Sequence, residues 1–512
     1  ITADGLALGD SQKATFGASD DLQIYHDGVN SFISDIGTGS LVLRASDSLL
    51  LQGANGDDYL VASVGGSVGL GYANAIKLAT TSTGVDITGT VVSDGMSTNT
   101  AGTSNFVAGV NAGNSIVSGG NDNTLVGDNA GASTTTGIRN TALGVSALYT
   151  NSTGGYNTSI GRETLYSNTT GSQNTATGYN TLRSNTTGTN NTANGMQSLR
   201  QNTTGANNTA SGYQALYSNT TASYNTAVGF QAMLDNTTGQ FNVGIGQMAL
   251  ANNTTANSNT AMGYQAGNLN TTGANNTVIG FQSFEDNTTG TSNVALGSKA
   301  LASNTTANYN TAVGYHSLNY NTTGASNVAT GAHALKFNTT GSSNTADGYD
   351  ALYKNTTGSN NTASGYFALF ANTTGVQNVA VGALALDANT TAHNNTAIGF
   401  SALTANTTGS QNTASGYRAL GANTIGADNV AVGYTALQSN TTASNNTVMG
   451  VSAMYANITG TQNVAMGRSA LQSNTTASNN TAVGSSALNA NTTGTGSTAF
   501  GYRAGIATTT GT

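Results

Sequence analysis

Apolar and polar positions follow a 17-residue frame over most of this chain. A typical copy runs from Asn168 to Ser184 and reads NTTGSQNTATGYNTLRS. Between Asn151 and Asn491 the frame never slips: 340 residues make 20 intervals of 17, and hence 21 copies. Degenerate copies begin at Thr134 and Thr508. A period of this size, held without insertion, predicts a solenoid in which one small unit stacks on itself.

Within each copy, the alternation of side chains indicates short strands. Counting the Asn of Asn-Thr-Thr-Gly as position 1, positions 7 to 12 alternate with period two, as in NTAVGY at 310–315. This pattern predicts a strand followed by a turn, and a second extended piece is expected at the Ala-Leu of positions 14 and 15. Frequent Gly, Asn and Thr disfavour helix. We therefore predict an all-β, parallel β-solenoid (β-roll) of about 22 coils, roughly 105 Å long at about 4.8 Å per coil.

Three positions of the copy hardly vary. Positions 1 and 11 are Asn and Gly in all 21 copies, and position 7 is Asn in every copy but the last, which has Ser497. Stacked asparagines can form amide ladders along the axis. An unsubstituted Gly indicates positive φ or a backbone packed too closely for a Cβ. In two neighbouring copies, the predicted structural ladder comprises Asn168, Asn174, Gly178, Asn185, Asn191 and Gly195.

Each coil offers little to bury. We expect an Ala, a Leu, a β-branched residue and one more side chain inside, which is a thin core for a monomer. Small residues at positions 9 and 14 would permit close approach of neighbouring chains. Association about the long axis is therefore expected, as a homotrimer.

The first hundred residues have a different texture. Apolar runs at 22–25, 41–43 and 49–51 alternate with turn-forming residues, which predicts short strands with tight connections. We expect a β-rich module over residues 1–100 and the solenoid over 101–512, with the junction at 94–116.

Composition narrows the function classes. Charged residues make up only 7%, the net charge is −8, and Cys, Pro and Trp are absent. This excludes a disulfide framework and a Cys metal site, and it supplies no basic surface for nucleic acid. No apolar run is long enough for a membrane-spanning helix. The chain starts at Ile1 and stops within a copy, which we interpret as a fragment or a processed piece.

Position 12 is the most suggestive surface position, because it is aromatic in 12 of the 21 copies. One hypothesis is a row of platforms for sugar rings; the favoured one is a stacked ladder that covers the turn and stiffens the rod. The candidate residues are Tyr179, Tyr213, Phe230, Tyr264, Phe281, Tyr315, Tyr349, Tyr366, Phe400, Tyr417 and Tyr434, with Tyr502 in the last copy.

Catalytic and metal chemistry finds little support in the sequence. His316 and His333 both occupy position 13, in adjacent copies, and would lie one coil apart. One hypothesis is that they form a cation site; the favoured one is that they are two surface residues without such a role. His26 fits a structural turn residue. The acidic residues of the array occupy different positions, without a repeated carboxylate pair. We expect no enzyme activity, no cofactor and no metal.

Two resemblances bear on function. The stretch NTAVGFQA at 225–232 resembles the head repeats of YadA-like trimeric autotransporter adhesins, which form a trimeric left-handed parallel β-roll. Their units are shorter, so the Asn-Thr-Thr-Gly turn here would be an enlargement. The stretches KATFG at 13–17, DLQIYHDG at 21–28 and IKLATTSTGVDITG at 76–89 resemble tail-fibre proteins of marine and cyanophage-type bacteriophages. In those proteins the module is a trimeric shaft, often followed by repeats and a C-terminal chaperone, which here would follow Thr512.

Together these features predict a structural and adhesive protein: a rigid homotrimeric tail fibre of a virion, extracellular, that projects host-recognition elements. Its expected partners are its own copies, tail or baseplate proteins at the N-terminal side, and a glycan or protein of the bacterial surface, without nucleic acid or membrane insertion. The alternative is an adhesin on a bacterial cell surface. An ice- or glycan-binding solenoid and a glycan depolymerase are further hypotheses.

Overall fold

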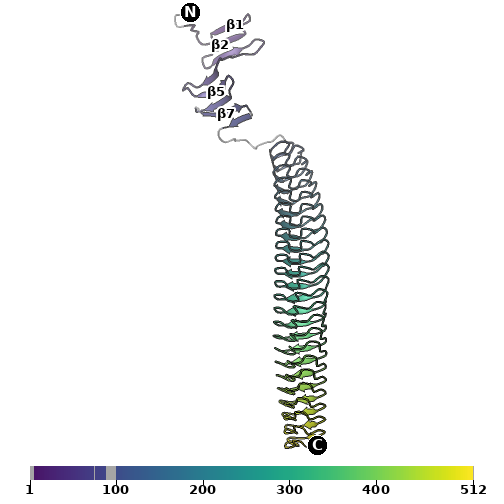
Figure 1. The fold of residues 1–512 in the computed structure, drawn as a ribbon. Coiled ribbons are helices and arrows are strands. Elements are labelled where there is room, and N and C mark those ends of the chain that lie inside the picture. The colour runs from purple at the N-terminus through teal and green to yellow at the C-terminus, as the bar shows by residue number, and fades with distance from the viewer. Residues whose placement is uncertain (1–4, 74, 83, 88–99, 511–512) are drawn as a thin grey trace. The chain divides into compact units, whose positions relative to one another are not determined.

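The computed structural model describes residues 5–73, 75–82, 84–87 and 100–510. The chain divides into two compact units, Ile1–Gly95 and Met96–Thr512 (Figure 1). The described residues form only strands, turns and irregular segments, so none of them lies in a helix that could cross a membrane. Part of the expected junction, residues 94–99, lies outside the described residues.

The amino-terminal unit contains two antiparallel sheets. The first has the order β1 (Lys13–Phe16), β2 (Leu22–His26) and β3 (Ser31–Asp35). The second is a meander of β4 (Ser48–Gln52), β5 (Asp58–Ser63), β6 (Val68–Tyr72), β7 (Ala75–Thr81) and β8 (Gly84–Ile87). The apolar runs at 22–25 and 49–51 lie in β2 and β4. The run at 41–43 lies in no strand, so that expectation was wrong.

Neither sheet of this unit has a hydrophobic core. Among its described residues no hydrophobic side chain is buried, and large ones such as Leu6, Val29 and Tyr72 are exposed. A sheet with one layer has nothing to cover its apolar face, and such sheets need a packing partner for stability. In the described part of this unit, the apolar side chains are therefore exposed to solvent and available for packing against another protein surface.

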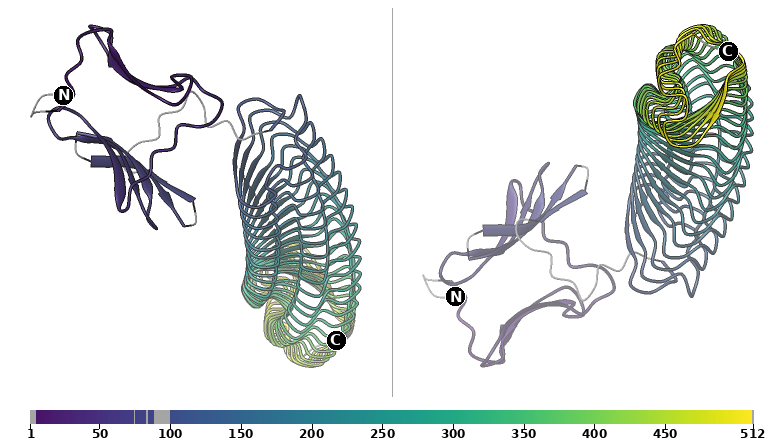
Figure 2. Two further views of the ribbon diagram at one scale, coloured as in Figure 1. Left: turned by 90° about the horizontal axis from the view of Figure 1, so that it is seen from above. Right: turned by 90° about the horizontal axis from the view of Figure 1, so that it is seen from below.

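The second unit is a parallel β-solenoid, which confirms the predicted fold class. Twenty-four strands of three residues, β9 to β32, each pair in register with the strand of the next coil (Figure 1). β9 and β10 are 18 residues apart, and every later strand follows after 17. Figure 2 shows the elongated loops of successive coils lying over one another.

The strands of the solenoid are β9 (Phe106–Ala108), β10 (Thr124–Val126), β11 (Thr141–Leu143), β12 (Thr158–Ile160), β13 (Thr175–Thr177), β14 (Thr192–Asn194), β15 (Thr209–Ser211), β16 (Thr226–Val228), β17 (Val243–Ile245), β18 (Thr260–Met262), β19 (Thr277–Ile279), β20 (Val294–Leu296), β21 (Thr311–Val313), β22 (Val328–Thr330), β23 (Thr345–Asp347), β24 (Thr362–Ser364), β25 (Val379–Val381), β26 (Thr396–Ile398), β27 (Thr413–Ser415), β28 (Val430–Val432), β29 (Thr447–Met449), β30 (Val464–Met466), β31 (Thr481–Val483) and β32 (Thr498–Phe500).

The second extended piece expected at positions 14 and 15 does not form, and that expectation was wrong. Positions 12 to 17 make turns instead, with positive φ at positions 13 and 15, for example 55° at Asn180 and 49° at Leu182. An extended chain would point positions 14 and 15 to opposite sides. The left-handed residues let both side chains enter the core, as Thr181 and Leu182 do.

Hydrogen bonds between coils continue through these turns. The Leu182 N–H donates to the Ser198 carbonyl of the next coil at 3.0 Å, whereas the Asn180 N–H donates to the Arg162 carbonyl of the preceding coil at 3.1 Å. Backbone groups outside the strand are therefore satisfied along the same axis as those within it.

The core of each coil is small and partly polar. In the copy that starts at Asn202, the fully buried side chains are those of Asn202, Asn208, Ala210, Ala215 and Leu216. The β-branched residue of position 8 is not among them, because only the middle residue of each strand points inward. Positions 9 and 14 are enclosed by their own coil, so these small residues cannot bring neighbouring chains together. That part of the argument for a trimer was wrong.

Two asparagine columns run through this interior. At position 1, Asn185 Nδ2 donates to Asn168 Oδ1 at 2.8 Å. At position 7, Asn191 Nδ2 donates to Asn174 Oδ1 at 3.1 Å. The two columns meet at the position-4 carbonyl: Gly188 O accepts from Asn185 at 3.0 Å and from Asn174 at 2.9 Å. Buried amides arranged in this way satisfy one another from coil to coil.

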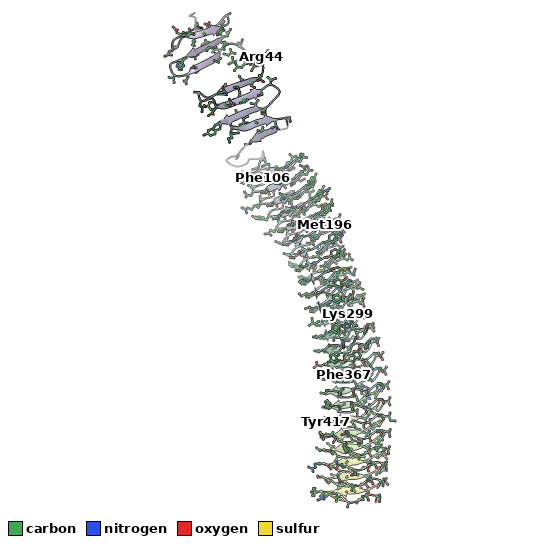
Figure 3. All side chains as sticks on the ribbon, turned by 60° about the vertical axis from the view of Figure 1, so that its left-hand side comes forward. Arg44, Phe106, Met196, Lys299, Phe367 and Tyr417 are labelled. Carbon is green, nitrogen blue, oxygen red and sulfur yellow. The ribbon has the colours of Figure 1, made fainter. Side chains whose placement is uncertain are left out.

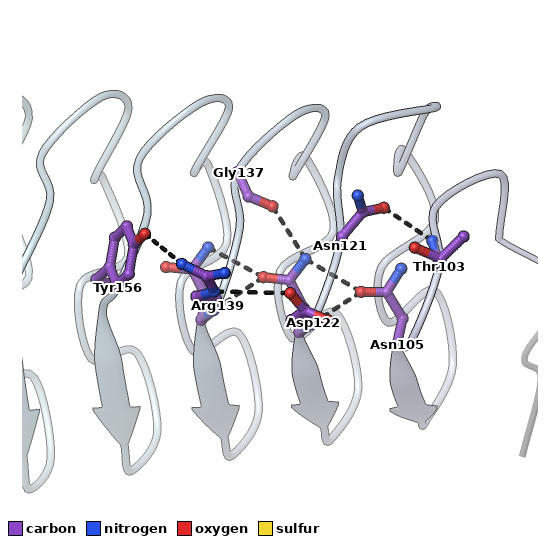
Figure 4. A network of polar contacts seen from close by, with 9 residues as sticks. Thr103, Asn105, Asn121, Asp122, Gly137, Arg139 and Tyr156 are labelled. Atoms are coloured by element: carbon purple, nitrogen blue, oxygen red, sulfur yellow. Dashed lines mark hydrogen bonds and ion pairs between the residues drawn. The ribbon is translucent and has the colours of Figure 1, made fainter. Parts of the chain in front are cut away.

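The position-7 column begins in the first coils of the solenoid (Figure 4). There Asn123 Nδ2 donates to Asn105 Oδ1 at 3.1 Å and to the Gly137 carbonyl at 2.9 Å. At the other end of the column, Ser497 replaces Asn, and Asn480 Nδ2 is buried without a partner. The ladder thus passes through the whole described array with little interruption.

Candidate functional site

The outer face of the solenoid's sheet carries an apolar column at one of its two outward positions. In each strand, positions 8 and 10 point outward, and position 10 carries large exposed hydrophobic side chains in many coils. Six successive coils hold Val228, Ile245, Met262, Ile279, Leu296 and Val313 at this position. An apolar column of this length, next to the aromatic residues of position 12, is more than the scattered hydrophobic residues of an ordinary surface.

The aromatic residues of position 12 lie on the surface, directly after the invariant Gly. All eleven candidates, from Tyr179 to Tyr434, are exposed, as is Tyr502. Rings in adjacent coils stack in parallel, for example Tyr213 on Phe230 with centroids 5.3 Å apart and Tyr417 on Tyr434 at 5.1 Å. Further stacks join Tyr264 to Phe281, Tyr349 to Tyr366, and Phe400 to Tyr417.

These stacks do not form one continuous ladder. Non-aromatic residues at position 12, such as Gln247, Ser298 and Ala332, separate them. The column is a series of short stacks, so each can stiffen two or three coils and each leaves aromatic surface open to solvent. Figure 3 shows side chains projecting from the coils along the whole solenoid, Phe367 and Tyr417 among them.

Further aromatic stacks occur at positions that the sequence analysis did not single out. Position 16 stacks Tyr149 on Tyr166, with centroids 4.9 Å apart. Position 17 stacks Tyr320 on Phe337 at 5.2 Å. In the sequence, these stacks appear only as aromatic residues at the same position of two consecutive copies. That pattern is a weaker indication than the twelve aromatic residues at position 12.

The histidines of position 13 lie one coil apart, as the frame predicted. The ring centroids of His316 and His333 are 6.0 Å apart, and His333 Nδ1 lies 3.1 Å from Asp350 Oδ1 in the following coil. Burial lowers the pKa of His316, and the neighbouring side chains of Lys336, His333 and Lys299 lower this pKa further. Such surroundings disfavour a cation. The described residues hold no cluster of three or more His, Asp or Glu suited to a metal.

His26 lies at the end of β2, where its Nδ1 is 3.2 Å from Ser31 Oγ. The turn that follows is organised by the Asp27 carboxylate, which accepts the N–H groups of Asn30 and Val29. These hydrogen bonds lower the pKa of Asp27. The surroundings of His26 are those of a turn.

Asp387 is a half-buried carboxylate whose pKa is shifted by its surroundings. Burial raises its pKa, while the Thr404 hydroxyl donates to Asp387 Oδ1 at 2.5 Å. Because the pKa of Asp387 is higher in the folded state, protonated Asp387 contributes to the free energy of unfolding. This contribution is fully present below the unfolded-state pKa and is lost as pH rises through the folded-state pKa.

Asp387→Asn is therefore expected to stabilise the solenoid at pH 7 and to have little effect at about pH 3. The gain should be only a few tenths of a kcal/mol, because the group is half exposed and solvent screens it. Thermal melting of the full chain at the two pH values measures it. Asp428→Asn, the same change at an exposed site, is the control; an equal gain there would contradict the role of burial.

Comparison with protein-family models, with characterised proteins and with solved structures finds no match for this chain.

Proposed function

We propose that this chain is a structural and adhesive fibre: a homotrimeric tail fibre of a bacteriophage, in which the solenoid is a rigid spacer for attachment to a bacterial surface. The observation that carries the proposal is the pair of asparagine columns, which link coil to coil through the array together with the backbone ladder. Bending or pulling such a rod must strain or break buried hydrogen bonds, and each bond that is lost leaves buried polar groups unsatisfied. A uniform, stiff element of this kind suits a spacer.

Exposed apolar surface supports the homotrimer. The outer column at position 10 and the single-layer sheets of the amino-terminal unit both leave hydrophobic side chains in solvent. Identical chains would present identical columns at the same spacing, which is what a rotational axis along the rod requires. The resemblance of the stretches 13–17, 21–28 and 76–89 to tail-fibre proteins supports the viral setting.

The test is the mass of the full chain by light scattering, with electron microscopy of its shape. We expect a mass near three times 51.0 kDa and a thin rod of roughly 100 Å or more. The double variant Met262→Lys and Ile279→Lys, which charges the outer column, should lower the mass towards 51.0 kDa or loosen the rod.

The matched control is a pair of lysines at position 3, Thr255→Lys and Thr272→Lys, in the same two coils but at exposed polar sites. This variant should keep the mass of the parent. A monomeric parent would overturn the homotrimer. Equal loss of mass in both variants would show that charge in general, rather than the outer column, disrupts assembly.

A further inference from the structure

A hollow of about 400 Å³ lies on the solenoid between three coils, away from the outer face of the sheet. It is lined by Tyr320, Phe337, Thr339, Lys354 and Thr356. All five belong to positions 17 and 2 of their copies, whereas the strands occupy positions 8 to 10. Its volume falls in the range of small-molecule sites.

Two stacked rings form one wall of the hollow. Tyr320 and Phe337 are nearly parallel, at 7°, with centroids 5.2 Å apart. The ring of Tyr353 is nearly perpendicular to that of Phe337, at 88°, with centroids 5.0 Å apart, so it packs against the pair. Both wall residues remain exposed to solvent. Because the two rings face each other, the stack presents its exposed edges as a fixed apolar wall, which favours a ligand with an apolar side.

In the next copy, position 17 is a lysine and no longer an aromatic residue. Lys354 follows Phe337 at position 17, and its ammonium lies 5.1 Å from the ring centroid of Phe370. The ammonium of Lys336 lies 5.4 Å from the ring centroid of Phe337 and 5.6 Å from that of Tyr353. Within the part of the chain that the structure describes, no carboxylate forms an ion pair with either lysine. Their charge remains available to a ligand.

The local charge differs in sign from that of the whole chain. All three lysines of the solenoid lie between residues 299 and 354, with Asp347 and Asp350 as the only acidic residues there. This stretch has a formal charge of 3 − 2 = +1, whereas the whole chain has −8. Asp350 contacts His333, which further limits its effect on the lysines.

The two threonines supply acceptors. Thr339 Oγ1 donates to the Thr356 carbonyl at 3.0 Å, and Thr356 Oγ1 donates to the Thr373 carbonyl at 3.0 Å. Each hydroxyl has therefore given its proton to the backbone and keeps lone pairs for an incoming hydroxyl group. A row of such oxygens beside an aromatic wall suits a polyhydroxylated ligand.

We propose that this hollow binds an acidic saccharide, as a residue of an anionic polysaccharide. The apolar C–H groups of a sugar ring lie against the exposed edges of Tyr320 and Phe337, its hydroxyls donate to Thr339 and Thr356, and its carboxylate pairs with Lys354. Single-stranded nucleic acid also stacks on aromatic residues, but it needs a basic groove along its backbone, and Lys354 is the one basic residue among those that line this hollow. The inference rests on the proposed attachment function and assigns it a ligand class.

The experiment is calorimetric titration of the full chain with polygalacturonate oligosaccharides, with neutral galactan oligosaccharides and a single-stranded oligonucleotide as comparison ligands. We expect binding of the acidic saccharide that weakens with added salt. Lys354→Gln and Phe337→Ala should each weaken it at least tenfold. The controls are Lys77→Gln, which removes the same charge from the amino-terminal unit, and Phe241→Ala, which disrupts a ring stack of similar geometry with Tyr224.

Equal weakening by Phe337→Ala and Phe241→Ala would overturn the site, as would preference for the oligonucleotide or for the neutral saccharide. Absence of saccharide binding by a chain that assembles as a fibre and adheres to bacteria would also overturn it, while leaving the proposed function intact. A chain that binds the acidic saccharide with the expected variant pattern but is a monomer supports the site and removes the homotrimer.

Discussion

Asn191→Asp is expected to open the solenoid locally and to lower the free energy of opening of the neighbouring coils by about 3 to 5 kcal/mol at pH 7. Asn191 Nδ2 donates to Asn174 Oδ1 at 3.1 Å and to the Gly205 carbonyl at 2.9 Å. A carboxylate would set a buried negative charge against two acceptors, with no proton to share. Hydrogen exchange of the amides around residues 174–208 measures the effect.

The same substitution one residue earlier is the control. Asn190 is exposed, so Asn190→Asp should change local protection by less than about 0.5 kcal/mol. The penalty of Asn191→Asp should also shrink towards pH 4, because a protonated carboxyl regains one donor and its folded-state pKa must be raised at this buried site. Equal protection in the two variants would show that the interior ladder contributes little.

Gly178→Ala is the second change with a large expected effect, a local loss of about 3 kcal/mol or more. Gly178 has φ of 130°, a region that is essentially confined to Gly. A Cβ there would also lie 2.8 Å from the carbonyl carbon of Gly195 in the next coil. Since both coils are held by the ladder, neither can move away freely. Hydrogen exchange of coils 161–195, or their proteolysis, reports the loss.

Gly171→Ala in the same copy is the matched control. This position-4 Gly lacks positive φ, although a Cβ would crowd Asn168 and the Gly188 carbonyl. Six copies already carry Ala at position 4, and Asn208 Nδ2 still donates to the Ala222 carbonyl at 2.9 Å in one of them. We expect a cost below about 1 kcal/mol. A cost as large as that of Gly178→Ala would show that contact, and not φ, decides at both positions.

The candidate surface could be predicted only where the repeat itself carried the signal. Position 12 was evident because its aromatic residues recur. The hollow could not be predicted from the repeat. Tyr320, Phe337 and Lys354 all occupy position 17, but they are different kinds of side chain and so form no recurring pattern. Their proximity to Thr339 and Thr356 depends on how positions 17 and 2 pack across three coils.

By itself, the sequence determined the period, the parallel β-solenoid and the stacking of Asn and Gly at fixed positions, since a repeat that never slips must place equal residues above one another. Only the tertiary structure decided which side chains point inward. Positive φ at positions 13 and 15 removes the alternation on which the sequence pattern depends, so Ala215 and Leu216 enter the core together. The one indication of this backbone in the sequence was glycine in place of Leu at position 15, at Gly267 and Gly505, where φ is 61° and 62°.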